Sequence, residues 1–167
     1  MEFVPQRGAV LLDAGTTTGR FAELLPAGRE LTVVTNCLPI ASALSSHPSL
    51  DVMIAGGRVR SRTLAAVDDF AVRFLGELAP DVAFVAANGV TPGRGLTTPD
   101  PAEAAVKRAM VRSGRRVVLL ADHTKVGQEH FARFAATEEI DVLVTDSGLD
   151  DGSAGEFEAA GVEVVRA

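Results

Sequence analysis

Small, hydroxylic, amide and cationic residues follow five of the short apolar runs in this sequence, and these residue types suit a phosphate ester. In the first such segment, Asp13 and Gly15 lead into the consecutive threonines Thr16, Thr17 and Thr18 at the start of a predicted helix. Free backbone N–H groups and the positive end of a helix dipole favour an anion, and the hydroxyls add donors. The spacing is neither GxxxxGK[ST] nor GxGxxG. We expect a phosphate to bind here, with helix capping by a threonine as the alternative interpretation.

Lys125 lies in a short polar segment directly after another apolar run. Its ammonium can close over a phosphate or a carboxylate as a point charge, and a solvated surface lysine is the ordinary alternative. No triad spacing surrounds His123 in the same segment, so we expect it to be a polar loop residue and not a catalyst. The only cysteine, Cys37, is expected to be a small packed residue and not a nucleophile.

The remaining segments carry weaker signals. Asn36 suits sugar hydroxyls, although capping of the following helix is the alternative. Gly56 and Gly57 permit either close approach of the backbone to a ligand or a simple turn. Asn88 followed by a glycine is a turn signal by default.

Arg58 begins a basic alternation with Arg60 and Arg62. We expect most of this alternation to be a solvated edge, with Arg58 the candidate to reach an anion. Five consecutive strand ends with groups compatible with a sugar phosphate are poorly explained as independent turns and caps. We therefore expect these segments to share one binding site.

The elements that must position these residues are predicted from hydrophobic spacing. Seven apolar runs read as strands covered on both faces, and several are followed by helical spacing. This pattern predicts an α/β fold with a mostly parallel sheet covered by helices on both faces. Ligands bind outside the carboxyl ends of such strands. The predicted strands are residues 9–12, 31–34, 52–55, 82–86, 117–121, 142–144 and 162–165; the predicted helices are 20–25, 39–46, 67–78, 101–112 and 155–160, with turns at 92–95 and 150–153.

The composition excludes several classes of protein. The 167 residues, 47% hydrophobic and 23% charged, predict one globular domain over residues 1–167. The net charge of -6 disfavours direct binding of a nucleic-acid backbone. No long apolar window or signal peptide is present, which disfavours membrane insertion and secretion, and a single cysteine fits a reducing cytoplasm. Because the chain has no Trp or Tyr, recognition is expected to be mainly polar.

Taken in order, these segments resemble the C-terminal effector-sensing domain of DeoR-type bacterial transcriptional regulators. The resemblance runs from about residue 8 to residue 166. It rests on Leu12-Asp13-Ala14-Gly15-Thr16-Thr17-Thr18, Val34-Thr35-Asn36, Ala55-Gly56-Gly57-Arg58, Asn88-Gly89-Val90, Gly95-Leu96-Thr97-Thr98-Pro99 and Leu120-Ala121-Asp122-His123-Thr124-Lys125.

The resemblance implies the fold of ribose-5-phosphate isomerase, glucosamine-6-phosphate deaminase and CoA transferases, used here to sense a phosphorylated sugar without turning it over. It also implies a homo-oligomer, a dimer or a tetramer, and we expect no cofactor, metal or membrane partner. Many relatives have Asp where this chain has Asn88, which is expected to tune the sugar hydroxyls accepted. The implied effector-binding residues are Asp13, Gly15, Thr16, Thr17, Thr18, Asn36, Gly56, Gly57, Arg58, Asn88 and Lys125.

Family members normally carry an N-terminal winged helix-turn-helix, whereas about eight residues precede the first predicted strand here. We expect DNA contact only through such a module, which this chain lacks. Two interpretations stay open: a fragment of a longer regulator, and a regulator that naturally lacks the module.

A sugar-phosphate isomerase or deaminase is the alternative function. Such an enzyme needs a carboxylate placed to move a proton beside the sugar carbonyl. The loop after the fourth predicted strand, residues 87–91, contains no titratable group. Asp68, Asp69, Asp100 and Glu103 remain as candidate bases, but helix capping and solvated helix faces are the favoured roles for them.

Overall fold

The computed structural model describes residues 2–26 and 28–167, and its central feature is a seven-stranded sheet in which every neighbouring pair is parallel. All seven predicted strands belong to it, which confirms the predicted fold class. Across the sheet the order is β12 (Glu163–Arg166), β11 (Val142–Thr145), β9 (Val117–Leu120), β6 (Val82–Val85), β1 (Arg7–Leu12), β2 (Glu30–Thr35) and β3 (Leu50–Ile54).

The strand order reverses beside β1. From β1 the chain adds β2 and β3 on one side, then crosses to β6 on the other side of β1 and continues through β9 and β11 to β12. Strands β1 and β6 end side by side, with Leu12 paired to Phe84. In open parallel sheets a ligand crevice opens outside the carboxyl ends of the strands at such a switch point.

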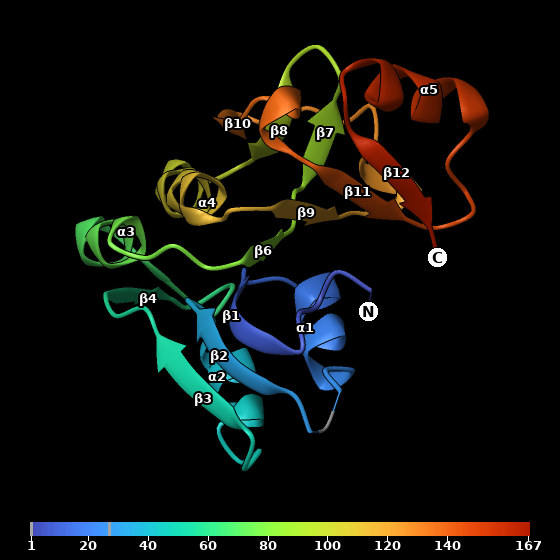
Figure 1. Ribbon diagram of the computed structural model, residues 1–167. Helices are drawn as coiled ribbons and strands as arrows, with labels where there is room; N and C mark the ends of the chain where they lie inside the picture. The colour runs from blue at the N-terminus through green and yellow to red at the C-terminus, as the bar shows by residue number, and fades with distance from the viewer. Residues whose placement is uncertain (1, 27) are drawn as a thin grey trace.

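Helices cover both faces of the sheet (Figure 1). Helices α1 and α2 pack on one face, where Ala22 and Ile40 join the same buried cluster as Phe84. Helices α3, α4 and α5 cover the other face. The five helices are α1 (Thr16–Glu23), α2 (Leu38–Leu44), α3 (Asp69–Gly76), α4 (Pro101–Ser113) and α5 (Asp151–Ala159).

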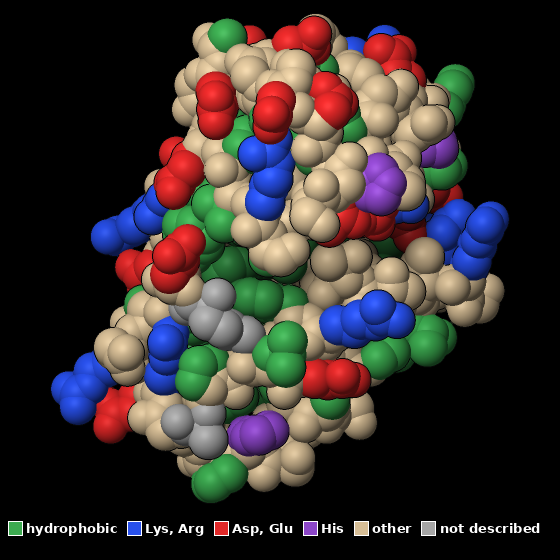
Figure 2. Space-filling model, turned by 90° about the vertical axis from the view of Figure 1, so that its right-hand side faces the viewer, with side chains coloured by type: hydrophobic (Ala, Val, Ile, Leu, Met, Phe, Trp, Pro, Cys, Tyr) green, Lys and Arg blue, Asp and Glu red, His purple; other side chains and the backbone are tan. Residues whose placement is uncertain are grey.

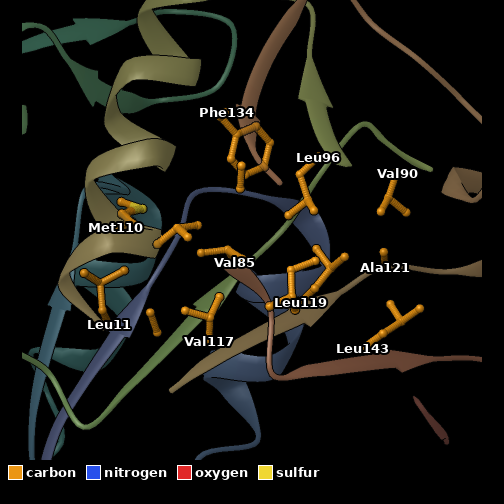
Figure 3. Packing of buried hydrophobic residues seen from close by; sticks show 14 of the residues in the cluster. Leu11, Val85, Val90, Leu96, Met110, Val117, Leu119, Ala121, Phe134 and Leu143 are labelled. Carbon is orange, nitrogen blue, oxygen red and sulfur yellow. The ribbon is translucent and has the colours of Figure 1, made fainter. Parts of the chain in front are cut away.

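The core on the second face is built from aliphatic side chains of neighbouring strands. Figure 3 shows Leu11, Val85 and Leu119 of the sheet beneath Met110 of α4, with Phe134 above them. All five side chains are at most 2% exposed. Burial of this kind supplies most of the stability of such a domain and fixes α4 against the sheet.

Five short strands are not predicted by the sequence patterns, because runs of three or four residues that pair with distant segments carry little periodic signal. They form a three-stranded antiparallel sheet and a hairpin on the α4 side. Gly95 in the former has φ +85°, and a Cβ there would lie 2.1 Å from the carbonyl oxygen of Ala135. These strands are β7 (Gly89–Thr91), β8 (Gly95–Thr98) and β10 (Ala132–Ala135), and the hairpin pairs β4 (Arg58–Arg60) with β5 (Ala65–Val67).

Two helices start four residues earlier than predicted. Helix α1 begins four residues early, at Thr16, and α5 begins at Asp151, so the prediction of a turn over residues 150–153 is wrong. The Asp150 carboxylate accepts from the Ser153 N–H (2.9 Å) and thereby caps α5, whereas polar and glycine residues alone suggest a loop. The predicted cap of α4 is confirmed, since Asp100 accepts from the N–H groups of Ala102 and Glu103.

The surface carries charges of both signs. Figure 2 shows one face, on which acidic and basic side chains are interspersed with exposed hydrophobic ones. Such mixed charge gives no one-sign field for a nucleic-acid backbone on that face. Within the described ranges, no helix has the length and apolar character needed to cross a membrane.

Candidate functional site

A pocket of about 450 Å3 opens at the carboxyl ends of β1, β6 and β9, beside the switch point of the sheet. Its walls come from four strand ends, from the β4–β5 turn and from one face of α4. The polar and cationic residues among them are Thr16, Thr17, Arg62, Thr63, Asn88, Glu103, Lys107, Asp122 and Lys125, and Ala14, Gly15, Cys37 and Ala86 lie between them.

The segment after β1 presents the N-terminus of α1 to this pocket. Gly15 is the N-cap residue, and no side chain caps the helix, so the alternative in which a threonine caps it is wrong. Thr16 and Thr17 are exposed and line the pocket. Thr18 is buried, and its Oγ1 donates to the carbonyl oxygen of Gly15 (3.0 Å). Thr16 and Thr17 are thus placed to donate to a ligand, whereas Thr18 holds the turn.

Asp13 and Lys107 form a buried ion pair behind the pocket. Asp13 is 1% exposed, and its Oδ2 accepts from Lys107 and from the N–H of Ala86 (3.0 Å). Lys107 also donates to the carbonyl oxygen of Ala86 (2.9 Å). The ammonium of Lys107 therefore reaches the pocket wall from α4 and is fixed by the strand ends of β1 and β6.

Lys107 is absent from the predicted site. The helical spacing of the sequence predicts an apolar face of Ala102, Ala105, Val106, Ala109 and Met110, whereas the buried residues of α4 are Ala104, Val106, Lys107, Met110 and Val111. Lys107 lies three residues after the buried Ala104 and three before the buried Met110. This spacing is the signal in the sequence that places its side chain on the buried face.

Asn36 lies next to the pocket, on a smaller cavity that shares Ala14, Glu103 and Lys107 with it. Asn36 is 3% exposed, and its Nδ2 donates to the carbonyl oxygen of Ala66 (3.1 Å). Capping of α2 by Asn36 is wrong, because the N-cap residue is Cys37 and no side chain makes the capping bond.

Asn88 reaches the pocket from the end of β6 and is oriented by the small antiparallel sheet. Its Oδ1 accepts from the Thr98 hydroxyl (2.9 Å), and its backbone N–H donates to the carbonyl oxygen of Thr97 (3.1 Å). Asn88 lies at a bend between β6 and β7, which agrees with its default interpretation as a turn residue, and Gly89 begins β7. The Asn88 Nδ2 remains available as a donor.

Lys125 lies at the end of a short 3-10 helix, η1 (His123–Lys125), and lines the pocket half-buried. The Asp122 carboxylate accepts from the Thr124 N–H (3.0 Å), and the Lys125 N–H donates to the Asp122 carbonyl (3.0 Å). His123 Nδ1 contacts Asp146 (2.8 Å) and does not line the pocket. These bonds fix the segment that carries Lys125.

The segment after β3 lies apart from the pocket. Gly56, Gly57 and Arg58 are exposed and do not line it. Gly57 has φ +134°, and a Cβ there would lie 2.7 Å from the carboxylate of Asp68, which accepts from the Arg58 N–H (2.9 Å). The glycine permits this close approach, and the segment opens the β4–β5 hairpin.

The turn of this hairpin reaches the pocket instead. Arg62 and Thr63 line it, and Arg62 is exposed as predicted while also facing the pocket. The prediction of a solvated edge is wrong for Arg60, which pairs with Asp100 (3.1 Å) and Glu103 (3.0 Å). The Thr63 hydroxyl also donates to Glu103 (2.7 Å), which ties the hairpin to α4.

Glu103 lies in the pocket wall with 12% of its side chain exposed, so its predicted place on a solvated helix face is wrong. The Arg60 guanidinium and the Thr63 hydroxyl both donate to its Oε1 and hold the carboxylate in place. Burial raises the pKa of the Cys37 thiol, which disfavours the reactive thiolate.

The chemistry of the pocket is that of an oxyanion and hydroxyl binding site. Three cations, Arg62, Lys107 and Lys125, face two carboxylates, with hydroxyls and an amide between them. No aromatic side chain is among the described lining residues, which disfavours stacking of a nucleobase. Among the described residues there is no group of three or more His, Cys, Asp or Glu side chains placed to hold a metal ion.

Comparison with solved structures supports the fold. Ribose 5 phosphate isomerase A from Neisseria gonorrhoeae superposes with a TM-score of 0.50 at 17% identity, covering 75% of this chain and 48% of that one. The beta subunit of eIF2B from Chaetomium thermophilum also gives a TM-score of 0.50, at 12% identity, covering 81% and 42% of the two chains. At these identities the likeness concerns the fold alone.

Comparison with curated sequences finds transcriptional regulators. The HTH-type transcriptional regulator GlpR of Haloferax volcanii is 39% identical over 165 residues, which cover 99% of this chain and 64% of that protein. The HTH-type transcriptional regulator IolR of Bacillus subtilis is 31% identical, covering 89% and 59%. A putative aga operon transcriptional repressor of Escherichia coli O157:H7 is 27% identical, covering 99% and 61%. The chain thus spans less than two thirds of the length of these relatives.

The family model described as the DeoR C terminal sensor domain matches residues 1–147. This match covers the strand ends that build the pocket, from the threonine loop after β1 to the Lys125 segment after β9. The resemblance drawn from the sequence motifs is confirmed, and the chain belongs to the DeoR C-terminal sensor domain family.

Proposed function

We propose that the pocket at the switch point binds a phosphorylated sugar as an effector and releases it unchanged. One observation carries the proposal: the threonine loop at the N-terminus of α1 and the ammonium of Lys125 line the same pocket. A helix N-terminus with free N–H groups favours an oxyanion, and a lysine adds a matching point charge.

The rest of the pocket suits the sugar. Its volume of about 450 Å3 lies within the usual range for small-molecule sites. The Asn88 amide, the Thr63 hydroxyl and the Asp122 carboxylate line it and offer partners for several hydroxyl groups. Arg62, brought in by the hairpin turn, is a second cation for the phosphate.

Binding without turnover is supported by the hydrogen bonds that Glu103 already makes. Glu103 is the candidate base that reaches the pocket, and this observation favours the isomerase or deaminase alternative. However, a general base needs a carboxylate oxygen that is free to accept a proton from the substrate, and the Oε1 of Glu103 already accepts from Arg60 and Thr63. The relatives are also named as regulators and not as enzymes.

We further propose that the effector acts by shifting a conformational equilibrium in a cytoplasmic homo-oligomer, a dimer or a tetramer. A ligand shifts such an equilibrium only if it binds one state better. Here the phosphate joins the threonine loop after β1 to the Lys125 segment after β9, and the proposed state with the higher affinity is the one that holds both segments on the phosphate. In a longer regulator this difference would reach DNA through an N-terminal helix-turn-helix module.

The test is differential scanning fluorimetry and calorimetry against a panel of sugar phosphates. At least one member should raise the melting temperature, and Lys125→Ala and Thr17→Val should each weaken its binding by about 10-fold, up to about 100-fold for the lysine. Arg115→Ala is the control, because Arg115 is exposed and does not line the pocket.

The proposal fails if no sugar phosphate stabilises the protein, or if Lys125→Ala and Arg115→Ala bind the ligand equally well. An isomerase or deaminase assay on the stabilising compound separates sensing from catalysis. Turnover that is lost in Glu103→Gln would establish the enzyme instead.

A further inference from the structure

The buried amide of Asn36 has one atom that no donor among the described residues satisfies. Its Nδ2 donates to the Ala66 carbonyl oxygen (3.1 Å), which fixes the orientation of the amide, since the flipped amide would set two oxygens against each other. The Oδ1 is buried and has no hydrogen-bond partner. An unpaired buried acceptor is costly and rare in native proteins, so this oxygen points to an occupant that donates to it.

Asn36 lines a small cavity that adjoins the main pocket and shares part of its wall. This inner cavity is lined by Asp13, Ala14, Asn36, Ala65, Glu103 and Lys107, three of which also line the pocket. Its volume of about 10 Å3 has room for about one water-sized group. A ligand in the pocket can therefore extend one small polar group into it.

The second wall of the inner cavity supplies a donor. The Lys107 ammonium has three N–H bonds, and its protein partners are Asp13 and the Ala86 carbonyl oxygen, so one N–H remains for a ligand. These two hydrogen bonds hold the ammonium in place. Lys107 is also buried, with 6% of the residue exposed.

The occupant must therefore donate to Asn36 and accept from Lys107. A hydroxyl group does both, because it carries one O–H donor and two lone pairs. A phosphate oxygen or an ionised carboxylate can only accept, and it would also face the carboxylates of Asp13 and Glu103 in the same cavity. Among the groups that a sugar phosphate carries, these constraints select a neutral alcohol group.

We propose that the inner cavity is a hydroxyl subsite, so that the effector binds with a free alcohol group inward, at Asn36 and Lys107, and its phosphate outward, at Thr16, Thr17 and Lys125. This inference rests on the proposed function and adds the orientation of the ligand and the class of compounds accepted. A sugar phosphate that lacks the inward hydroxyl leaves two buried polar groups unpaired and is rejected.

The test compares sugar phosphates with their deoxy analogues by calorimetry, starting with ribose 5-phosphate against 2-deoxyribose 5-phosphate and glucose 6-phosphate against 2-deoxyglucose 6-phosphate. For the sugar phosphate of the panel that binds, removal of one particular hydroxyl should weaken binding by about 10-fold or more. The Asn36→Leu variant should bind the full sugar phosphate more weakly than the unmodified protein does. It should bind the full sugar phosphate and that deoxy analogue with equal affinity. Inorganic phosphate should bind this variant and the unmodified protein alike.

Thr145→Val is the matched control. The Thr145 hydroxyl is the other buried group without a partner among the described residues, and it does not line either cavity. This variant should discriminate against the deoxy analogue as the unmodified protein does.

A crystal structure of the unmodified protein with the bound sugar phosphate gives a readout that needs no variant to fold. A ligand hydroxyl within hydrogen-bonding distance of Asn36 Oδ1 and Lys107 Nζ supports the proposal. A phosphate oxygen there, or only water there beside a bound ligand, overturns it while leaving the proposed function intact, as does an Asn36→Leu variant with undiminished discrimination. If no sugar phosphate binds at all, both proposals fail.

Discussion

Replacement of Lys107 by Met tests whether the pocket wall depends on the buried ion pair. Met has a similar length and shape but no charge, so Lys107→Met leaves the Asp13 carboxylate, 1% exposed, without its cation. The Ala86 N–H still donates to Asp13, but a single neutral donor does not replace an ammonium.

Removal of one partner of a buried ion pair costs about 3–5 kcal/mol of unfolding free energy, because the other charge stays buried and unpaired. For a domain of this size that corresponds to a fall in melting temperature of about 6–20 °C. Asp13→Asn should cost a similar amount, since it leaves the Lys107 ammonium without a counterion. The double variant should lose less than the sum of the two single losses, by about 1–3 kcal/mol, because no unpaired charge remains.

Urea denaturation at pH 7, followed by circular dichroism, measures the four free energies of this cycle. The control is Arg7→Met, which breaks the ion pair with Glu30, whose side chains are 79% and 68% exposed. An exposed pair contributes at most about 1 kcal/mol.

Two results would refute the reasoning. In the first, Lys107→Met unfolds at the same urea concentration as Arg7→Met. In the second, the double variant loses the full sum of the single losses, which would mean that the two side chains do not interact.

Three further substitutions or conditions test the surrounding structure. Gly95→Ala should lower the free energy of unfolding, measured in urea, by about 1–3 kcal/mol or more, because its Cβ would lie 2.1 Å from the Ala135 carbonyl oxygen. Gly93→Ala is the control and should cost little, because there is open space around Gly93. Equal losses in the two variants would contradict the packing described. Backbone N–H donation in the first turn of α4 keeps the pKa of Asp100 in the folded protein below its ordinary 3.8. The ionised Asp100 therefore stabilises the folded protein above about pH 4, and this contribution is lost as the pH falls through the lowered pKa of the folded state. The difference in melting temperature between the unmodified protein and Asp100→Asn should therefore be clear at pH 6 and vanish near pH 2; a constant difference would be evidence against this role. Because burial raises the pKa of the Cys37 thiol, it should react with a thiol reagent at pH 8 much more slowly in the folded protein than in urea, and equal rates would show that it is exposed.

The large sheet is predictable because its strands are covered on both faces. Such strands are continuously apolar, and the seven runs with this property all join the parallel sheet. The short strands of the antiparallel sheet and the hairpin carry no such signal. Their pairing depends on distant contacts, for example between β8 and β10, which a local pattern does not contain.

The site is predictable where it depends on strand ends near the switch point. The segments after β1, β6 and β9 meet at the pocket as expected, with Thr17, Asn88 and Lys125 in its wall. The segment after β3 does not, because β3 forms the edge of the sheet, two strands away from β1. Gly56, Gly57 and Arg58 are therefore carried away from the pocket, and the predicted role for them in effector binding has no support in the geometry.

Groups that reach the pocket from outside the strand ends are the ones that the pattern of strand ends does not reveal. Lys107 lies in the middle of a helix, and Arg62 and Thr63 lie in a hairpin turn whose position is set by the pairing of Arg60 with α4. The hairpin turn is placed by contacts with Glu103 about 40 residues away, and Lys107 by its ion pair with Asp13, 94 residues away. The residues that follow the strands therefore predict the part of the pocket at the sheet. They do not predict the wall formed by α4 and the hairpin turn.

The switch point divides the pocket between the two halves of the chain. Residues before β6 supply the threonine loop and the hairpin turn, and residues from β6 onward supply Asn88, Lys107 and Lys125. The ion pairs Asp13–Lys107 and Arg60–Glu103 cross the same boundary. If the chain were cut between α3 and β6, neither fragment would contain the complete site. An effector would then bind only the associated fragments and so favour their association.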